Sequence, residues 1–115
     1  MPEKAPLPDE EDQPILDLDH LASFTDGDRA LEDELAALYL STAEVYLEQM
    51  REALATGESW RAPAHALKGA SSNLSARRVA SLALAAEHAS PSAARLDPLR
   101  AGIEEVKAFF ASRPA

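Results

Sequence analysis

The chain has 115 residues, of which 46% are apolar, so it is long enough for one domain with a single hydrophobic core. It has no cysteine, which excludes disulfides and thiolate metal sites, and no apolar run approaches the roughly 18 residues of a membrane span. The net charge of −9 argues against nucleic acid or anionic lipid as the main partner. Because the first residues also lack signal-peptide features, we expect a soluble, cytoplasmic protein.

Residues 1–14 combine four prolines with five acidic residues and show no apolar periodicity. This composition buries too little apolar surface to fold, so we predict a disordered acidic tail followed by one domain over residues 15–115. A short helix or turn across the larger body is predicted between residues 15 and 24, where the apolar residues are Leu16, Leu18, Leu21 and Phe24. Residues 25–28 then supply turn and N-cap chemistry.

A long helix is predicted from this turn to about residue 55, because apolar and small residues recur on one stripe with helical spacing. The inward stripe is formed by Leu31, Leu35, Leu38, Thr42, Val45, Gln49 and Ala53, and is widened by Tyr46 and Met50. The acidic residues of this segment, Glu32 among them, fall mostly off that stripe. Thr56 and Gly57 are expected to end the helix.

Three further helices are predicted after residue 58. Ser59 is the expected N-cap of the first, whose inward stripe is Trp60, Ala64, Leu67, Ser71 and Leu74. Ser75 is the expected cap of the second, which buries Val79, Leu82, Ala83 and Ala86 and ends at Ser90, Pro91 and Ser92. Asp97 and Pro98 are the expected start of the last, with Leu99, Ile103, Val106 and Phe110 inward. The predicted fold is all-α, an antiparallel four-helix bundle with a short additional N-terminal helix.

The segment HALKGASSNL, which begins at His65, places an imidazole, an ammonium and a glycine at i, i+3 and i+4 of one helix face. Arg61 and Ser72 share that face, opposite the inward stripe. Gly69 costs about 0.5 to 1 kcal/mol relative to alanine and leaves the helix surface bare beside the imidazole. Residues 59–86 contain four basic residues and no acidic one, so positive charge is concentrated around His65.

The longer segment HALKGASSNLSARRVASLALAAE resembles the motif of histidine-containing phosphotransfer (HPt) domains. In that motif, His-x-Leu-Lys-Gly is followed by small residues, a leucine and a second helix that ends in glutamate. The resemblance covers about residues 15 to 112 and includes the tryptophan just before the motif helix. Two positions depart from the family pattern, because Ser75 stands where glycine is common and Ala70 where serine is common.

The resemblance implies a bundle that relays phosphoryl groups between receiver-domain aspartates, with His65 as the phosphoacceptor. Lys68 is then the cationic neighbour and Gly69 the small residue that gives access. The chemistry fits, because a neutral imidazole is a competent nucleophile and a nearby point charge stabilises the phosphoryl oxygens. From its spacing alone, we infer that Arg61 adds to that charge.

Glu87 follows His65 by 22 residues, where many family members carry glutamate or glutamine. On the antiparallel neighbouring helix, its carboxylate could accept a hydrogen bond from Nδ1–H, orient the ring and leave Nε2 as the nucleophile. The other interpretation is a solvated glutamate near a helix end.

Several residues keep two interpretations. Ser72 either contacts phosphate or bonds its own backbone. Arg77 and Arg78 either form a docking edge for an acidic receiver surface or are a solvated helix start. His20 and His88 are expected at the surface or its boundary, and the histidine spacing gives no metal site.

We therefore expect a monomeric phosphocarrier without kinase activity of its own, because the chain has no glycine-rich nucleotide site. No cofactor is expected on the chain, since magnesium would be supplied by the receiver. The expected partners are receiver domains of a hybrid histidine kinase and of a response regulator. Three alternatives remain: a docking module that carries no phosphate, the phosphoacceptor domain of a chemotaxis-type histidine kinase, and a purely structural helical protein. The ends of the sequence favour a complete small protein over the kinase domain.

Overall fold

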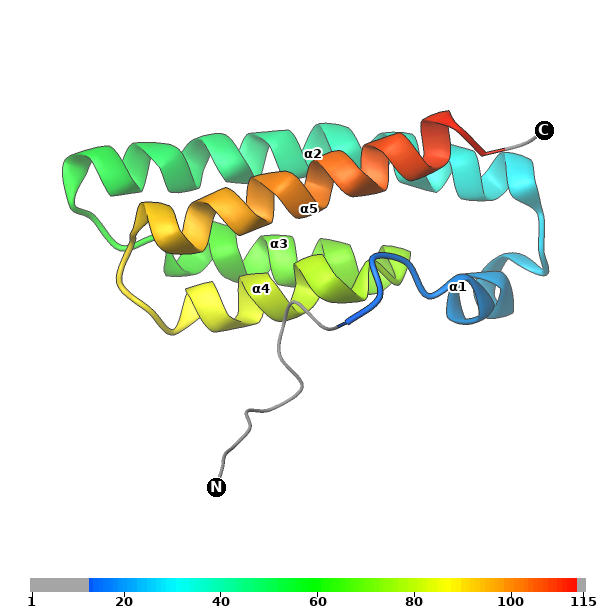
Figure 1. Ribbon diagram of the computed structural model, residues 1–115, viewed down its shortest axis with the longest axis horizontal. Helices are drawn as coiled ribbons and strands as arrows, with labels where there is room; N and C mark the ends of the chain where they lie inside the picture. The colour runs from blue at the N-terminus through cyan, green and yellow to red at the C-terminus, as the bar shows by residue number, and fades with distance from the viewer. Residues whose placement is uncertain (1–12, 114–115) are drawn as a thin grey trace, which may run out of the picture.

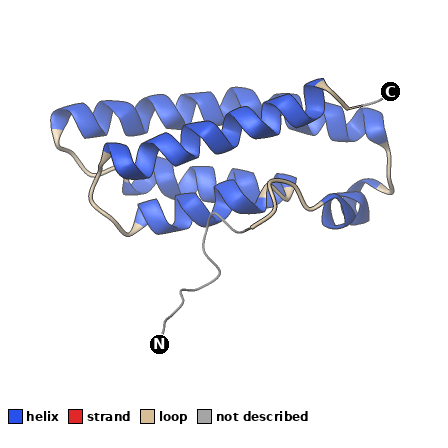
Figure 2. Ribbon diagram, viewed as in Figure 1, coloured by secondary structure: helices blue, strands red, loops and turns tan. Residues whose placement is uncertain are grey.

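The computed structural model describes residues 13–113, and these form five α-helices without a strand (Figures 1 and 2). The helices are α1 (Leu18–Thr25), α2 (Arg29–Thr56), α3 (Arg61–Leu74), α4 (Arg77–Glu87) and α5 (Ala93–Ala111). Four of them make the bundle: α2 lies beside α5, α3 lies beside α4, and the two pairs pack on each other. The fold is all-α, and the predicted four-helix bundle with a short N-terminal helix is confirmed.

The core lies between the two helix pairs and contains the predicted inward stripes of α3 and α4. Trp60 is its largest fully buried side chain, and its indole Nε1–H donates to the backbone oxygen of Ala86 at 2.8 Å. This bond joins the start of α3 to the end of α4. Deeper in the core, the hydroxyls of Tyr39 and Ser71 lie 2.9 Å apart, so the polar atoms of α2 and α3 satisfy each other. The packing fixes how α3 lies against both neighbours.

The helix ends follow the expected chemistry in the first half of the chain. The Asp28 carboxylate accepts from the backbone N–H of Leu31 and caps α2. Gly57 ends that helix with φ of 78°, a left-handed conformation that glycine adopts without a steric penalty. The Ser59 hydroxyl accepts from the backbone N–H of Arg61, so it serves the first turn of α3 from one residue before the assigned cap.

The predicted inward stripe of α2 is wrong over most of its length. Leu31, Leu38 and Val45 are exposed, with 38%, 65% and 53% of their surface accessible. Met50 and Ala53 are buried as predicted, but the other buried residues are Glu32, Ala36, Tyr39 and Ala43 of the adjacent stripe. Both stripes have helical spacing. The alanines explain the choice, because small side chains let α3 and α5 approach the α2 backbone closely.

The predicted starts of the last two helices are also wrong. Ser75 does not cap α4 but ends α3, with φ of 67°, the conformation in which glycine is usual. Helix α5 starts at Ala93, capped by the Ser92 hydroxyl on the N–H of Arg95, and Pro98 lies inside it. Because Pro98 is only the sixth helical residue, it removes one backbone bond close to the helix start.

The N-terminal segment is partly as predicted. Its helix spans Leu18–Thr25, slightly later than expected. Leu16 and Leu21 are buried, whereas Leu18 and Phe24 are exposed at 43% and 63%. The predicted tail lies outside the described residues except for its last two, which both bind Arg78: the Pro14 oxygen accepts from its backbone N–H, and the Gln13 oxygen accepts from its side chain.

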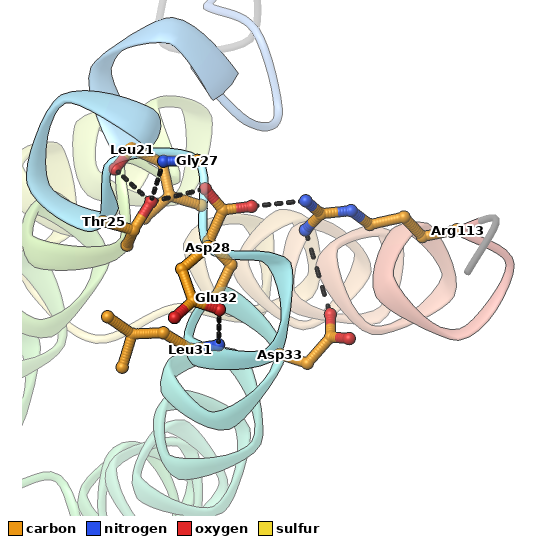
Figure 3. Close-up of polar contacts among 8 residues, drawn as sticks. All are labelled: Leu21, Thr25, Gly27, Asp28, Leu31, Glu32, Asp33 and Arg113. Carbon is orange, nitrogen blue, oxygen red and sulfur yellow. Dashed lines mark hydrogen bonds and ion pairs between the residues drawn. The ribbon is translucent and has the colours of Figure 1, made fainter.

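A polar network fastens the end of α5 to the junction of α1 and α2 (Figure 3). Glu32 is 3% exposed; its carboxylate accepts from the Thr25 hydroxyl at 2.6 Å and forms an ion pair with Arg113. Asp33 lies 3.8 Å from the same guanidinium. Glu32 is thus buried with its charge compensated, which the sequence stripe did not predict.

Candidate functional site

Helix α3 presents its polar face to solvent because its opposite face is fully engaged in the core. Trp60, Ala64, Leu67, Ser71 and Leu74 are all at most 3% exposed. The helical period therefore turns Arg61, His65, Gly69 and Ser72 outward, and all four are exposed, while Lys68 is half-buried on the same face. The sequence predicted this division of the helix correctly.

His65 is held by one side-chain contact from the neighbouring helix. Its Nδ1 lies 2.9 Å from the Glu87 carboxylate oxygen Oε2, yet the imidazole side chain remains 62% exposed. An ionised carboxylate only accepts hydrogen bonds, so Nδ1 must carry the proton. In the neutral ring, the lone pair is then on Nε2.

The surroundings of Glu87 favour its ionised form. Burial alone would raise the pKa of its carboxyl, because the side chain is only 6% exposed. The hydrogen bond from His65 and the electrostatic influence of His65, Lys68 and His88 outweigh burial, so the pKa of the Glu87 carboxyl lies below its ordinary value. The carboxylate is therefore available to accept from the imidazole over the physiological pH range.

One Glu87 oxygen has no hydrogen-bond partner among the described residues: Oε1 is buried and unpaired, while Oε2 receives His65. Arg61 Nε lies 3.9 Å from Oε2, so the arginine that we inferred to add positive charge near His65 lies against the carboxylate that binds His65. The Arg61 side chain is 71% exposed, which makes this ion pair weak and leaves the guanidinium accessible to an incoming anion.

Gly69 faces open space. A Cβ built on it would have no atom within 4 Å outside its own helix backbone and chain neighbours. No contact among residues 13–113 therefore requires glycine at this position. The bare surface lies one turn from His65, on the solvent side of α3.

Arg77 and Arg78 lie away from the acceptor, where α4 begins. Arg77 Nε donates to Asp17 Oδ2 at 2.7 Å, and Arg78 Nη1 donates to Glu105 Oε1 at 2.7 Å. These contacts attach the N-terminal segment and α5 to the start of α4. The structure therefore gives both arginines intramolecular partners and does not bring them to His65.

An apolar groove follows α3 on its α2 side. Its volume is about 230 Å³, and it is lined by Leu35, Leu38, Tyr39, Thr42, Ala70, Asn73 and Leu74. Sequence reasoning missed this surface because it assigned Leu38 to the core. The available signal was the second apolar stripe of α2, next to the alanine-containing one.

The described part of the chain has neither a metal-binding cluster nor a membrane-spanning helix. No three His, Cys, Asp or Glu side chains come together in a way that would hold a metal ion among residues 13–113. Over the same residues, no helix has the length and apolar character that a membrane crossing requires.

The family model for the Hpt domain matches residues 34–110, which is more than half of the chain. The chain belongs to the Hpt domain family. A search of curated proteins and a search of solved structures gave no match. Membership makes the protein a phosphotransfer module of two-component signalling, a class that interacts with receiver domains. The matched range contains the whole of α3 and α4, and hence both His65 and Glu87.

Proposed function

We propose that this Hpt domain relays a phosphoryl group from the aspartyl phosphate of one receiver domain to the aspartate of another, with His65 as the intermediate acceptor. The observation that carries the proposal is the exposed imidazole whose Nδ1 is occupied by Glu87 at 2.9 Å. A ring that is fixed at one nitrogen and open at the other suits attack by Nε2 on an incoming phosphorus.

In the proposed transfer, His65 Nε2 is the nucleophile and the receiver's aspartate is the leaving group. The Nε2 lone pair of His65 forms a bond to phosphorus while the bond from phosphorus to the aspartyl oxygen breaks and releases a carboxylate. The ring keeps its Nδ1 proton and becomes positively charged, and the Glu87 carboxylate stabilises that charge. In the second transfer, a receiver carboxylate attacks phosphorus and the bond to Nε2 breaks. The proton on Nδ1 moves in neither step.

Lys68 and Arg61 place positive charge on either side of His65 along α3. Lys68 lies one turn after His65 and is close enough to Glu87 to lower its pKa. Arg61 lies one turn before His65 and is highly exposed. Both would stabilise the charge that spreads over the phosphoryl oxygens, while Ser72 is a weaker candidate contact on the same face. Magnesium would enter with the receiver's acidic pocket.

The receiver would dock over α3 and the neighbouring groove. Leu38 is 65% exposed and lines the groove together with Ala70 and Asn73 of α3. Apolar side chains left exposed beside an acceptor would be covered in a transient complex of modest size. Leu38→Asp should therefore weaken receiver binding, whereas Phe24→Asp, at a residue with 63% exposure on α1, should not.

The decisive experiment is phosphoryl transfer from a labelled receiver in the presence of magnesium. The wild-type protein should acquire an acid-labile, base-stable label, and His65→Gln should acquire none. His88→Gln is the matched control, because it removes an exposed histidine and should be labelled like the wild type. Receiver binding without labelling would instead favour a docking module. Labelling only by an ATP-loaded kinase domain would favour the chemotaxis-type alternative.

Glu87→Gln tests the role of the carboxylate. The amide oxygen can still accept from Nδ1–H, so the ring orientation survives while the charge is lost. A charged acceptor strengthens a hydrogen bond by about 1 to 1.5 kcal/mol, which corresponds to roughly a tenfold slower transfer. An unchanged rate would remove Glu87 from the mechanism and leave His65 as acceptor.

A further inference from the structure

A crevice separate from the His65–Glu87 contact lies where α1 meets α3 and α4. Its volume is about 350 Å³. It is lined by Gln13, His20, Lys68, Ser72, Ser75, Arg77, Ala80, Ser81 and Leu84. These residues come from the segment before α1 and from α1, α3, the turn after it and α4, so folding alone assembles the crevice.

The lining is cationic and rich in hydroxyl groups. Lys68 and Arg77 bring permanent positive charge, His20 brings an imidazole, and three serines bring hydroxyls. Among residues 13–113, no aspartate or glutamate lines the crevice, although the Asp17 carboxylate binds Arg77 from outside the lining. In a protein with a net charge of −9, this part of the surface therefore carries an excess of positive groups.

Two contacts hold the donors in place. The Arg77 side chain is 43% exposed and binds Asp17 through Nε, and a guanidinium has further N–H donors on its two terminal nitrogens. The His20 Nδ1 lies 2.7 Å from the Ser75 hydroxyl. When that hydroxyl donates to Nδ1, the second ring nitrogen carries a proton and is a donor. The His20 ring also packs edge-on against Phe24, with ring centroids 4.8 Å apart.

We propose that this crevice is a binding site for free inorganic phosphate. Its donors match the anion: an ammonium, a guanidinium, an imidazole and hydroxyls approach from several directions, as a tetrahedral ion with four oxygens requires. Among the described lining residues, His20 has the one aromatic ring and the apolar wall consists of Ala80 and Leu84, so the lining suits a small anion better than a nucleobase. The start of α4 has no side-chain cap, and its dipole adds to the positive potential.

Lys68 joins this site to the candidate acceptor. It lines the crevice and also lowers the pKa of Glu87. Its position three residues after His65 places it between the two sites along α3. Phosphate in the crevice would therefore compete for the same ammonium, but phosphate binding itself does not depend on His65 acting as an acceptor.

The test is a phosphate titration of the full chain followed by amide chemical shifts, at ionic strength held constant with chloride. The expected result is saturable shifts at Ser72, Ser75, Arg77 and Ser81, with a dissociation constant on the order of millimolar, as suits an open site. His65→Gln should give the same constant. Shifts that never saturate, or that centre on a different surface, would overturn the proposal.

Matched variants make the assignment specific. Arg77→Gln should weaken phosphate binding at least about fivefold, equivalent to about 1 kcal/mol. Arg100→Gln removes the same charge from an exposed residue of α5, which lines a different cavity, and should leave the constant unchanged. Arg77→Gln could weaken binding by disturbing the fold, so Lys68→Gln is a second variant. Lys68 is on the outer face of α3, and its replacement should weaken phosphate binding without unfolding the protein. Equal constants for Arg77→Gln, Lys68→Gln and the wild type would refute the site.

Discussion

Gly69→Ala should make the protein more stable and a poorer phosphocarrier. Glycine inside a helix costs about 0.5 to 1 kcal/mol relative to alanine. The added Cβ would meet nothing within 4 Å, so no clash offsets that gain. For a domain of this size, the expected increase in melting temperature is about 3 to 6 °C. Thermal unfolding followed by circular dichroism measures it.

Gly102→Ala is the matched control within the same protein. Gly102 is also in a helix, but a Cβ there would lie 3.0 Å from Cγ2 of Val79. Overpacking a well-packed core costs about 1 to 3 kcal/mol, which cancels or exceeds the propensity gain. This variant should therefore show no stabilisation.

The functional half of the Gly69 prediction is measured by receiver-to-protein transfer. A methyl group on the approach to His65 should obstruct the receiver, and a cost of about 1 kcal/mol or more in the transfer complex slows transfer about fivefold or more. A stabilised variant that transfers at the wild-type rate would refute the view that Gly69 exists for access. A variant without added stability would refute the claim of open space.

Four further variants test the fold around the site. Glu32→Gln should cost about 3 kcal/mol by leaving Arg113 buried without its main partner. Burial tends to raise the pKa of Glu32, but the Thr25 hydroxyl and Arg113 outweigh burial, so the pKa lies below its ordinary value. The free energy of unfolding that the ionised Glu32 contributes is therefore present above about pH 4.3 and is lost as the pH falls below it. The Glu32→Gln variant should not show this part of the acid destabilisation. Trp60→Phe should cost about 2 kcal/mol in chemical unfolding, since the fully buried ring loses volume and the Ala86 oxygen keeps only its backbone donor from Ala89. Ser75→Gly should be nearly neutral, because relief of the left-handed conformation offsets the lost hydroxyl contact, whereas Ser75→Ala should lose about 1 kcal/mol.

The arrangement around His65 was predictable because it depends on short-range periodicity. Helical spacing determines which residues of α3 share a face. The antiparallel return of α4 then brings residue 87 beside residue 65, at 2.9 Å between Nδ1 and Oε2. The sequence predicts that the ring faces outward, but it does not predict the burial of the Glu87 carboxylate. That burial depends on how far α4 leans over α3, which tertiary packing decides.

The errors at helix starts have a common cause. Ser75 and Pro98 were both assigned from residue preferences, and both are overridden by the surrounding structure. Ser75 takes a glycine-like φ of 67° where its hydroxyl binds His20 and its backbone oxygen accepts from Asp17 at 2.9 Å. Contacts to α1, distant in sequence, compensate the strained turn. No local pattern could reveal them.

The α2 stripe shows why an amphipathic pattern alone cannot separate a core from a binding surface. Two adjacent stripes of this helix are apolar, and the one with the larger side chains was assigned inward. The structure buries the alanine-containing stripe, since close approach of helices contributes more than the size of any single side chain. Leu38 is left exposed to water beside α3, and packing within the domain gives no reason for an apolar side chain there. The same residue lines the groove along α3, so the receiver docking that we propose would cover it during transfer.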